Sequence, residues 1–497
     1  MLAQLTSFAT VGIAARRINV EIGAPPGDGK MIIVGLGDTA VKESEQRVRL
    51  ALRSSGYRFP TGRRITVNLA PASLRKAGPR YDLPIAVGML LITGSLTIDE
   101  KKLESTAFLG ELALDGSVRH VAGVLPAAVA CRDLGIRTLV VPLTDAPEAA
   151  LISGIEIIGV GHLRDIVGIF SGEQLAPAVT AAVAQDIAEA VSTDFADIRG
   201  QYAAKRALEI AAAGGHNVLM NGAPGAGKTL LARALRGILP PMAIEEAIEV
   251  TRIYSVANML PEDSPLIGVR PFRVVHHTAS AVSIVGGGQM PGPGEISLAH
   301  RGVLFLDEIA EFPPAVLDVL RQPLEDRTIT ITRAQGSITF PADFTLVAAM
   351  NPPDTEHPNL RRGKRISAPL LDRIDLTIPV DSVAIADLQG ARPQNAETSA
   401  AIRSRVIAAR ALQLRRFGNA SPMSNAAMDV RHIDRLCQLS TPCAALLCRA
   451  ADKLKLSARA YHRTIKVART IADLGGSEAI DMPHIAEALQ YRTGNAE

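Results

Sequence analysis

The chain has 497 residues, of which 47% are hydrophobic and 21% are charged, and its formal net charge is +3. This balance is typical of a soluble globular protein of about three domains. Four cysteines are too few for a disulfide framework, and no apolar run is long enough to span a bilayer. The N-terminus has no basic segment ahead of an apolar core, so we expect no signal peptide, no membrane association and a cytoplasmic protein.

Residues 1–170 alternate strand-like and helix-like segments, which predicts one compact α/β or α+β domain. The three β-rich runs and three helical patterns lie at 18–22, 39–55, 64–69, 83–93, 124–134 and 138–142. A stretch rich in Ala, Val, Gln and Glu, residues 171–192, is typical of a linker.

The remaining chain divides into a motif-bearing segment, 193–385, and a helical segment, 386–497. The helical segment holds 16 Lys and Arg against 10 Asp and Glu, so it is basic while the rest of the chain is slightly acidic. A basic end permits contact with nucleic acid without requiring it.

Residues 222–229 match the pattern G-x-x-x-x-G-K-[ST] between a short apolar strand and a helix. Its residues are Gly222, Ala223, Pro224, Gly225, Ala226, Gly227, Lys228 and Thr229. Glycines let the backbone turn its N–H groups toward phosphate oxygens, and the helix N-terminus favours anions. We therefore expect Lys228 to reach the β- and γ-phosphates of a nucleotide and Thr229 to bind Mg²⁺.

A second apolar strand, Val303 to Leu306, ends in the carboxylates Asp307 and Glu308. Because ligands bind at the carboxyl ends of parallel strands, Asp307 is expected to hold Mg²⁺ and Glu308 to polarise the attacking water. An acidic pair at a strand end is also common on protein surfaces, but its combination with the phosphate loop favours the functional interpretation.

Two further polar residues follow the third apolar strand, 344–350. Asn351 is a candidate sensor of the γ-phosphate, although an Asn before Pro352 is also an ordinary turn residue. Arg373 is a candidate to stabilise charge on a neighbouring subunit's nucleotide. The alternative for Arg373 is a surface ion pair with Asp372 or Asp375.

The segment between the phosphate loop and the acidic strand leaves room for an inserted hairpin, with Gly286, Gly287 and Gly288 as its expected tip. Alternating β-branched residues at 328–332 and 337–340 predict a second hairpin. The neighbouring His276 and His277 invite a metal assignment, but side chains adjacent on a strand point to opposite faces. No metal is assigned to them.

Together, residues 193–480 resemble the AAA+ ATPases, which implies ATP and Mg²⁺ as ligands, a parallel-sheet core and a helical lid. The resemblance makes Ile198 and Tyr202 the candidates for contact with adenine. It makes Arg459 the second sensor arginine, with Arg463 as its rival one helical turn away.

The segments 272–280 and 293–302 resemble the magnesium-chelatase-like branch of that family. Hairpins of that branch face a central ring pore, which implies Arg333 as a candidate contact to DNA phosphate. An ordinary exposed hairpin arginine is an equally good interpretation.

Segments 76–84 and 106–116 resemble the proteolytic domain of the Lon family, so residues 1–170 are expected to form a Lon-protease-like α+β domain. That family uses a Ser activated by a Lys. Arg80 and Leu125 stand at the two positions here, so we expect no proteolysis and a structural or DNA-facing domain.

This succession of domains resembles the ComM/YifB group, which implies a hexameric ATP-driven motor that moves DNA branches during recombination in natural transformation. Members of that group often carry a cysteine cluster after the sensor Asn, and this chain has none. The loop instead holds Arg361, Arg362, Lys364 and Arg365, which either follow a phosphate backbone or form a solvated charge run.

The leading alternative is a chelatase-type ATPase that remodels a protein partner. A protease is disfavoured by Arg80 and Leu125, and a non-hydrolysing nucleotide switch is disfavoured by Glu308.

Overall fold

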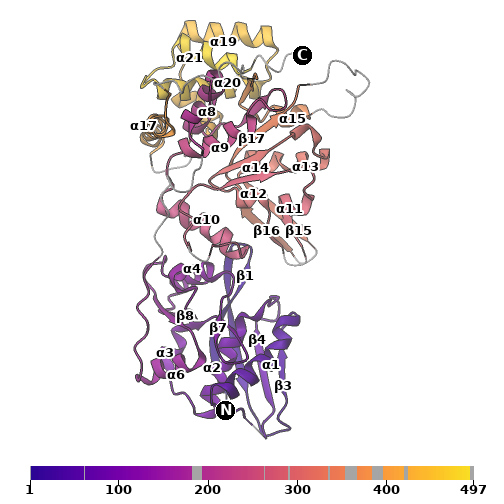
Figure 1. Cartoon of the computed structure of the whole chain (residues 1–497), viewed down its shortest axis with the longest axis vertical. Helices are drawn as coiled ribbons and strands as arrows, with labels where there is room; N and C mark the ends of the chain where they lie inside the picture. The colour runs from indigo at the N-terminus through magenta and orange to yellow at the C-terminus, as the bar shows by residue number, and fades with distance from the viewer. Residues whose placement is uncertain are drawn as a thin grey trace. The chain divides into compact units, whose positions relative to one another are not determined.

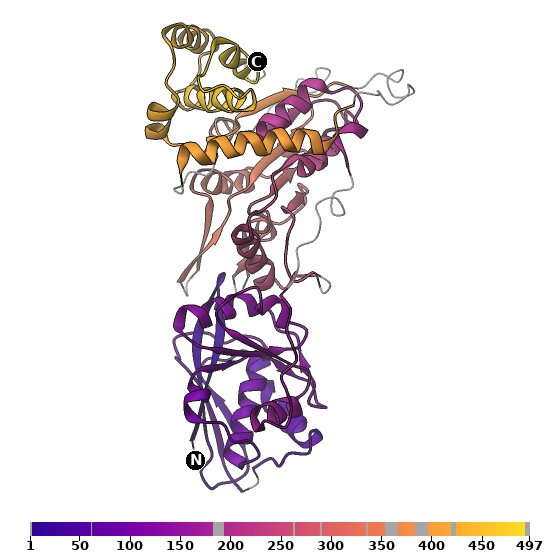
Figure 2. The same ribbon diagram turned by 90° about the vertical axis from the view of Figure 1, so that its left-hand side faces the viewer.

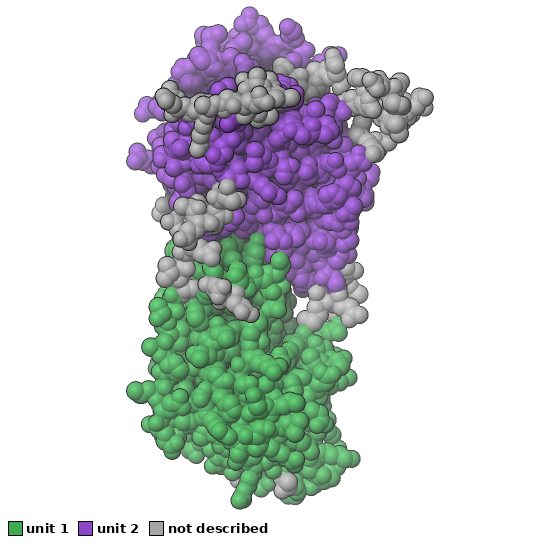
Figure 3. All heavy atoms as spheres, in the orientation of Figure 1, with its two compact units in different colours: residues 1–185, 244–267 green, residues 186–243, 268–497 purple. Residues whose placement is uncertain are grey.

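The computed structural model describes residues 2–60, 62–181, 193–261, 264–288, 291–333, 336–352, 366–382, 396–418 and 424–492. The chain folds into two compact units (Figure 3). Unit 1 comprises Met1–Gln185 and Ile244–Ile267, and unit 2 comprises Asp186–Ala243 and Gly268–Glu497. Among the described residues, no helix combines the length and the apolar character needed to cross a bilayer.

Unit 1 is built on a seven-stranded mixed sheet with the order β3-β4-β2-β1-β5-β8-β9 (Figure 1). Strands β1 and β2 pair antiparallel over ten residues, and β5, β8 and β9 continue the sheet in parallel from β1. The seven strands are β1 (Leu2–Val11), β2 (Ala14–Gly23), β3 (Met31–Val34), β4 (Ile65–Ala70), β5 (Thr106–Phe108), β8 (Thr138–Pro142) and β9 (Glu156–Val160), with β6 (Glu111–Leu112) and β7 (Val118–Arg119) in a separate hairpin.

Helices complete unit 1, and the most apolar of them, α2, buries ten of its twelve residues. The helices are α1 (Thr39–Ser54), η1 (Pro79–Tyr81), α2 (Asp82–Thr93), α3 (Glu100–Glu104), α4 (Val124–Leu134), α5 (Ala146–Ala149), α6 (Leu163–Ser171) and α10 (Ile244–Val256). The six elements expected from the sequence before residue 143 are confirmed to within a few residues.

Helix α10 is contributed to unit 1 from within the segment expected to form the ATPase core. It packs against α4, and the N–H of Gly123 donates to the carbonyl of Ser255 at 3.2 Å. The guanidinium of Arg252 also donates to the carbonyl of Ile13 at 3.0 Å. Residues 244–267 therefore belong to the unit of the first 185 residues, whereas the sequence placed them with 193–385.

Unit 2 contains a five-stranded parallel sheet with the order β11-β14-β17-β10-β18. All four residues of β14 are buried, as expected for a strand covered on both faces. Its strands and the elements packed with them are η2 (Phe195–Asp197), α8 (Tyr202–Gly214), β10 (Val218–Asn221), α9 (Lys228–Ile238), β11 (Phe272–Val275), α11 (Ala281–Val285), α12 (Glu295–Leu298), β14 (Val303–Leu306), η3 (Ile309–Glu311), α13 (Pro314–Val319), α14 (Arg321–Asp326), β17 (Thr345–Met350), α15 (Ala368–Leu371) and β18 (Leu376–Pro379).

Two small hairpins accompany this sheet. Strands β15 (Thr328–Arg333) and β16 (Gly336–Pro341) form the hairpin expected from the β-branched pattern, and it extends from the body of unit 2 (Figure 2). The second hairpin pairs β12 (Gly286–Gly287) with β13 (Gly292–Pro293). The prediction that Gly286 and Gly287 form a tip is wrong, because both pair in a strand; a Cβ on Gly286 would lie 2.4 Å from the carbonyl oxygen of Gly292.

The C-terminal part of unit 2 is helical, as expected. Its helices are α17 (Ser399–Phe417), η5 (Asn425–Ala427), α18 (Val430–Leu436), α19 (Thr441–Leu454), α20 (Ala458–Leu474) and α21 (Met482–Gln490). They share one apolar core with α8, α9 and the strands of the sheet. The helical segment and the sheet therefore pack together within unit 2.

Candidate functional site

The candidate site lies where β10, β14 and β17 end, at the carboxyl edge of the parallel sheet. The loop from β10 to α9 lies so close to the residue that follows β18 that a Cβ on Gly222 would lie 2.1 Å from the carbonyl oxygen of Val380. Gly225 and Gly227 have φ values of 80° and 93°, which side chains rarely adopt. Close approach and positive φ therefore explain why the pattern has glycine at these positions. The loop leads into the N-terminus of α9.

Lys228 is largely buried at the first position of α9. Its ammonium donates to the carbonyls of Gly222 and Ala223 and, at 2.9 Å, to Oδ1 of Asn351. Burial lowers the pKa of Lys228, and the nearby Asp307 and Glu308 partly oppose this effect. The structure thus brings together Lys228 and Asn351, which are 123 positions apart in the chain.

Thr229 and Asp307 form the second contact across the site. The Thr229 hydroxyl lies 3.4 Å from Oδ2 of Asp307, and Oδ1 of Asp307 accepts the N–H of Glu308 at 3.0 Å. A hydroxyl and a carboxylate oxygen side by side are the hard oxygen donors that Mg²⁺ prefers. The donor set fits the expected Mg²⁺ ligands, Thr229 and Asp307.

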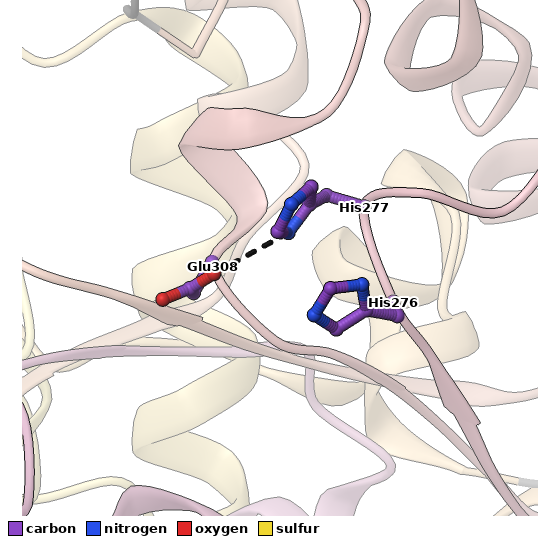
Figure 4. Close-up of side chains that lie close together, drawn as sticks. All are labelled: His276, His277 and Glu308. Carbon is purple, nitrogen blue, oxygen red and sulfur yellow. Dashed lines mark ion pairs between the residues drawn. The ribbon is translucent and has the colours of Figure 1, made fainter.

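Glu308 follows the buried strand β14 with a left-handed backbone, φ 53°. Its side chain is 45% exposed, and its Oε2 lies 3.3 Å from Nδ1 of His277 (Figure 4). A non-glycine residue in this conformation stores strain of the kind that functional sites tolerate. The carboxylate is therefore available to solvent and has one nitrogen neighbour that the sequence did not indicate.

The expectation that the side chains of His276 and His277 point to opposite faces of a strand is wrong. Strand β11 ends at Val275, so both residues lie beyond the strand, where side chains no longer alternate. Their ring centroids are 4.1 Å apart, and both rings lie on the side facing Glu308 (Figure 4).

Arg373 and Arg459 meet at a carboxylate that the sequence analysis missed. Oε1 of Glu325, on α14, lies 2.8 Å from the guanidinium of Arg373 and 3.4 Å from that of Arg459. Arg373 is buried and also donates to the carbonyl of Pro369 at 2.6 Å, whereas the Arg459 side chain is 58% exposed. The expected alternative partners of Arg373, Asp372 and Asp375, are not its ion-pair partners.

The rival of Arg459, Arg463, is part of a buried structural cluster. Its guanidinium lies 2.7 Å from Asp375 and donates to the carbonyl of Arg373 at 2.6 Å. Burial opposes ionisation of Asp375, but Arg463, His216 and Arg492 together hold its pKa far below the usual value. This arrangement favours Arg459 over Arg463 as the arginine that faces a ligand.

The two candidates for adenine contact lie before and at the start of α8. Ile198 is buried, while Tyr202 is 79% exposed. Between them, the amide of Gln201 donates to the carbonyl of Ala226 at 3.3 Å, so this segment is tied to the phosphate loop.

The candidate DNA contacts are less completely described. Arg333 ends strand β15, and its side chain lies outside the described residues. Arg361, Arg362, Lys364 and Arg365 all lie outside the described residues.

In unit 1, Arg80 lies beside Gly123, two residues before Leu125. A guanidinium nitrogen of Arg80 donates to Oγ1 of Thr10 at 2.6 Å and would lie 3.6 Å from a Cβ on Gly123. Leu125 follows at the start of α4 and is fully buried. A guanidinium and an isobutyl group supply neither a nucleophile nor its base.

Three family descriptions match successive parts of the chain. "Subunit ChlI of Mg-chelatase" matches residues 20–145, "Magnesium chelatase, subunit ChlI" matches 194–388 and "Magnesium chelatase, subunit ChlI C-terminal" matches 396–492.

Two relatives align with this chain over nearly their whole length. The chain is 44% identical to the competence protein ComM of Haemophilus influenzae, over 99% of this chain and 97% of that protein. It is 42% identical to the protein YifB of Salmonella typhimurium over the same shares. A 38 kDa magnesium-chelatase subunit of Cereibacter sphaeroides is 28% identical over only 38% of this chain and 58% of its own length.

Proposed function

Because this chain belongs to the ComM/YifB family of magnesium-chelatase-like AAA+ ATPases, we propose that it couples ATP hydrolysis to movement along branched DNA. The proposal has three parts: hydrolysis at the site described above, DNA as the substrate of the motion, and assembly into a ring. The setting we propose is recombination during natural transformation.

The hydrolysis part rests on one observation, the convergence of Lys228, Thr229, Asp307, Glu308 and Asn351 at one edge of the sheet. A bound triphosphate would replace the carbonyls of Gly222 and Ala223 as partners of the Lys228 ammonium. Mg²⁺ bound by Thr229 and Asp307 would neutralise phosphate charge. Glu308 would orient a water molecule and accept its proton, and Asn351 would fix the γ-phosphate beside Lys228.

The DNA part is supported by likeness and charge. The relative at 44% identity is named a competence protein, and competence is the uptake of DNA by cells. The basic residues of the hairpin and of the loop after β17, Arg333, Arg361, Arg362, Lys364 and Arg365, are the candidates for phosphate contacts.

The ring part concerns Arg373 and Arg459. In the structure both arginines pair with Glu325 of their own chain. We propose that a neighbouring subunit's nucleotide competes with Glu325 for Arg373, which makes hydrolysis dependent on assembly; a hexamer is the expected form.

ATPase rates measured with single strands, duplexes, forks and four-way junctions test the proposal. We expect forks or junctions to raise the rate, an effect that weakens steeply with salt. Lys228→Ala should abolish hydrolysis, while Lys453→Ala, an exposed change on α19, should not. A rate indifferent to every DNA structure would refute the DNA part and leave the hydrolysis part standing.

The second candidate is a chelatase-type motor that remodels a protein partner, and the matches to chelatase subunit families favour it. Its weakness is coverage, because the chelatase relative aligns with only 38% of this chain. Stimulation of the ATPase by a partner protein, with none by DNA, would establish this candidate instead.

A further inference from the structure

Three side chains beside the candidate site form a cluster with metal-binding chemistry. One nitrogen from each of His276 and His277 and one carboxylate oxygen of Glu308 all lie within 4.8 Å of one another (Figure 4). They come from the loop after β11 and from the end of the adjacent strand β14, which pair in parallel. The two paired strands end one or two residues before the three side chains, so the sheet anchors the backbone from which the cluster extends.

The nitrogen of His277 that faces Glu308 has no hydrogen-bond partner among the described residues. Its Nδ1 is buried, and although Oε2 of Glu308 lies 3.3 Å away, the geometry between them is not that of a hydrogen bond. A buried polar atom without a partner normally indicates a ligand, water or ion that the chain itself does not supply. His276 uses Nδ1 toward the hydroxyl of Thr278 at 3.0 Å, which leaves its Nε2 for a ligand.

We propose that His276, His277 and Glu308 form a site for a divalent transition-metal ion, with Zn²⁺ as the preferred occupant. Two imidazoles and one carboxylate are a donor set of zinc sites that keep one position open for water. Imidazole nitrogen is a poor ligand for Mg²⁺, so the ion that accompanies ATP does not compete for this site.

Small side-chain movements suffice to close the cluster on an ion. Zn–N and Zn–O bonds of about 2 Å place tetrahedral ligand atoms roughly 3.4 Å apart, so a pair separated by as much as 4.8 Å must approach by up to about 1.4 Å. His276 is exposed and Glu308 is 45% exposed, so both can change rotamer without disturbing the core.

Occupancy would act on hydrolysis through Glu308. A carboxylate that coordinates a metal ion is a much weaker base, so it no longer accepts a proton effectively from the attacking water. Bound Zn²⁺ would therefore stop turnover while leaving Lys228, Thr229 and Asp307 free to bind Mg-ATP. This consequence rests on the proposed function, whereas metal binding itself does not.

The binding test uses Co²⁺ as a spectroscopic substitute for Zn²⁺ in the full-length, nucleotide-free protein. We expect one Co²⁺ per chain with the visible absorption of a four- or five-coordinate site, displaced by Zn²⁺. His276→Ala, His277→Ala and Glu308→Gln should each weaken binding at least about tenfold, and His432→Ala, which changes a half-buried histidine on α18, should not. Equal Co²⁺ spectra in the wild type and all three site variants would overturn the proposal.

The functional test measures ATP hydrolysis at fixed Mg-ATP while a metal buffer sets free Zn²⁺. Each protein is compared with its own zinc-free rate. The wild type should lose activity over the range in which Zn²⁺ displaces Co²⁺, and His276→Ala should require at least about tenfold more zinc. Equal sensitivity of both proteins would contradict the inhibitory role. A protein without any ATPase activity would fail the proposed function, while its Co²⁺ spectra would still decide the metal site.

Discussion

Lys228, Asp307 and Asn351 lie far apart in the chain, yet each could be identified from its own sequence context. Lys228 stands in the G-x-x-x-x-G-K-[ST] pattern. For Asp307 and Asn351, an apolar run followed at once by a polar residue marks the end of a buried strand, and parallel strands end at one edge. The partners His277 and Glu325 carried no such signal. Their contacts, at 3.3 Å to Glu308 and 2.8 Å to Arg373, depend on which loops approach each other in space.

At the residue scale, Glu308→Gln is expected to retain ATP binding and lose hydrolysis by at least about a hundredfold, because an amide accepts no proton from water. Binding of a fluorescent ATP analogue and phosphate release measure the two properties separately. Glu311→Gln, in the exposed turn just after the site, is the matched control and should keep both. Near-normal hydrolysis by Glu308→Gln would remove this residue from the mechanism.

Arg459 and Arg463 should respond oppositely to substitution by alanine. Arg463→Ala leaves Asp375 ionised and buried without its main partner, so we expect a loss of about 3–5 kcal/mol in the free energy of unfolding. Arg459→Ala removes an exposed ion pair with Glu325, so stability should change by less than about 1 kcal/mol while ATPase activity falls. Denaturant unfolding and phosphate release on both variants test this; a stable Arg463→Ala protein that has lost its ATPase would reverse the assignment.

At the element scale, strands and helices could be predicted from the length and spacing of their apolar residues. The element against which a helix packs could not be predicted in this way. Helix α10 buries Ala247, Val250, Ile253 and Tyr254 on one face. This spacing indicates that the face is buried, but it does not indicate which element buries it. Its partner, α4, lies more than a hundred residues earlier in the chain. The assignment of residues 244–267 to unit 1 therefore required the structure.

The attachment of α10 should weaken as pH rises. The hydrogen bond that His120 donates to the Asp145 carboxylate raises the pKa of His120 to about 9, and His120 also contacts Asn258 at 2.7 Å. Burial raises the pKa of Glu148, which accepts the N–H of Leu125, to about 7. Both groups bind protons more tightly when folded, so stability falls from about pH 4.5 to 7 through Glu148 and from about 6.5 to 9 through His120.

Amide exchange of residues 244–258, corrected for the intrinsic rate at each pH, measures this attachment. Protection should decrease from about pH 5 to about pH 9.5, and His120→Ala should flatten the upper half of the curve. His432→Ala, which removes another histidine–aspartate pair, should leave the curve unchanged. Protection that is constant with pH would show that these groups do not hold the helix.

At the scale of the whole molecule, the ring proposal predicts that two inactive variants rescue each other. Lys228→Ala cannot use its own nucleotide, and Arg373→Ala cannot assist a neighbour's. In an equal mixture, one interface in four would join an intact loop to an intact arginine, so about a quarter of the wild-type rate is expected. Phosphate release from the mixture and mass measurement with and without ATP test this, with thermal melting to confirm that Arg373→Ala is folded. A mixture as inactive as its components would argue against action between subunits.

The route of the backbone between the two units has a practical consequence. The chain passes from unit 1 to unit 2 after residue 185, returns at 244 and leaves again after 267. Cleavage at a protease site inserted near residue 188 would therefore sever one of three covalent connections. The two fragments should still co-elute, because α10 remains packed against the N-terminal fragment. Deletion of the N-terminal fragment would instead expose the apolar face of α10 to solvent and promote aggregation. Aggregation of such a truncated protein would then result from loss of the surface that covers α10 and not from a defect in the ATPase site.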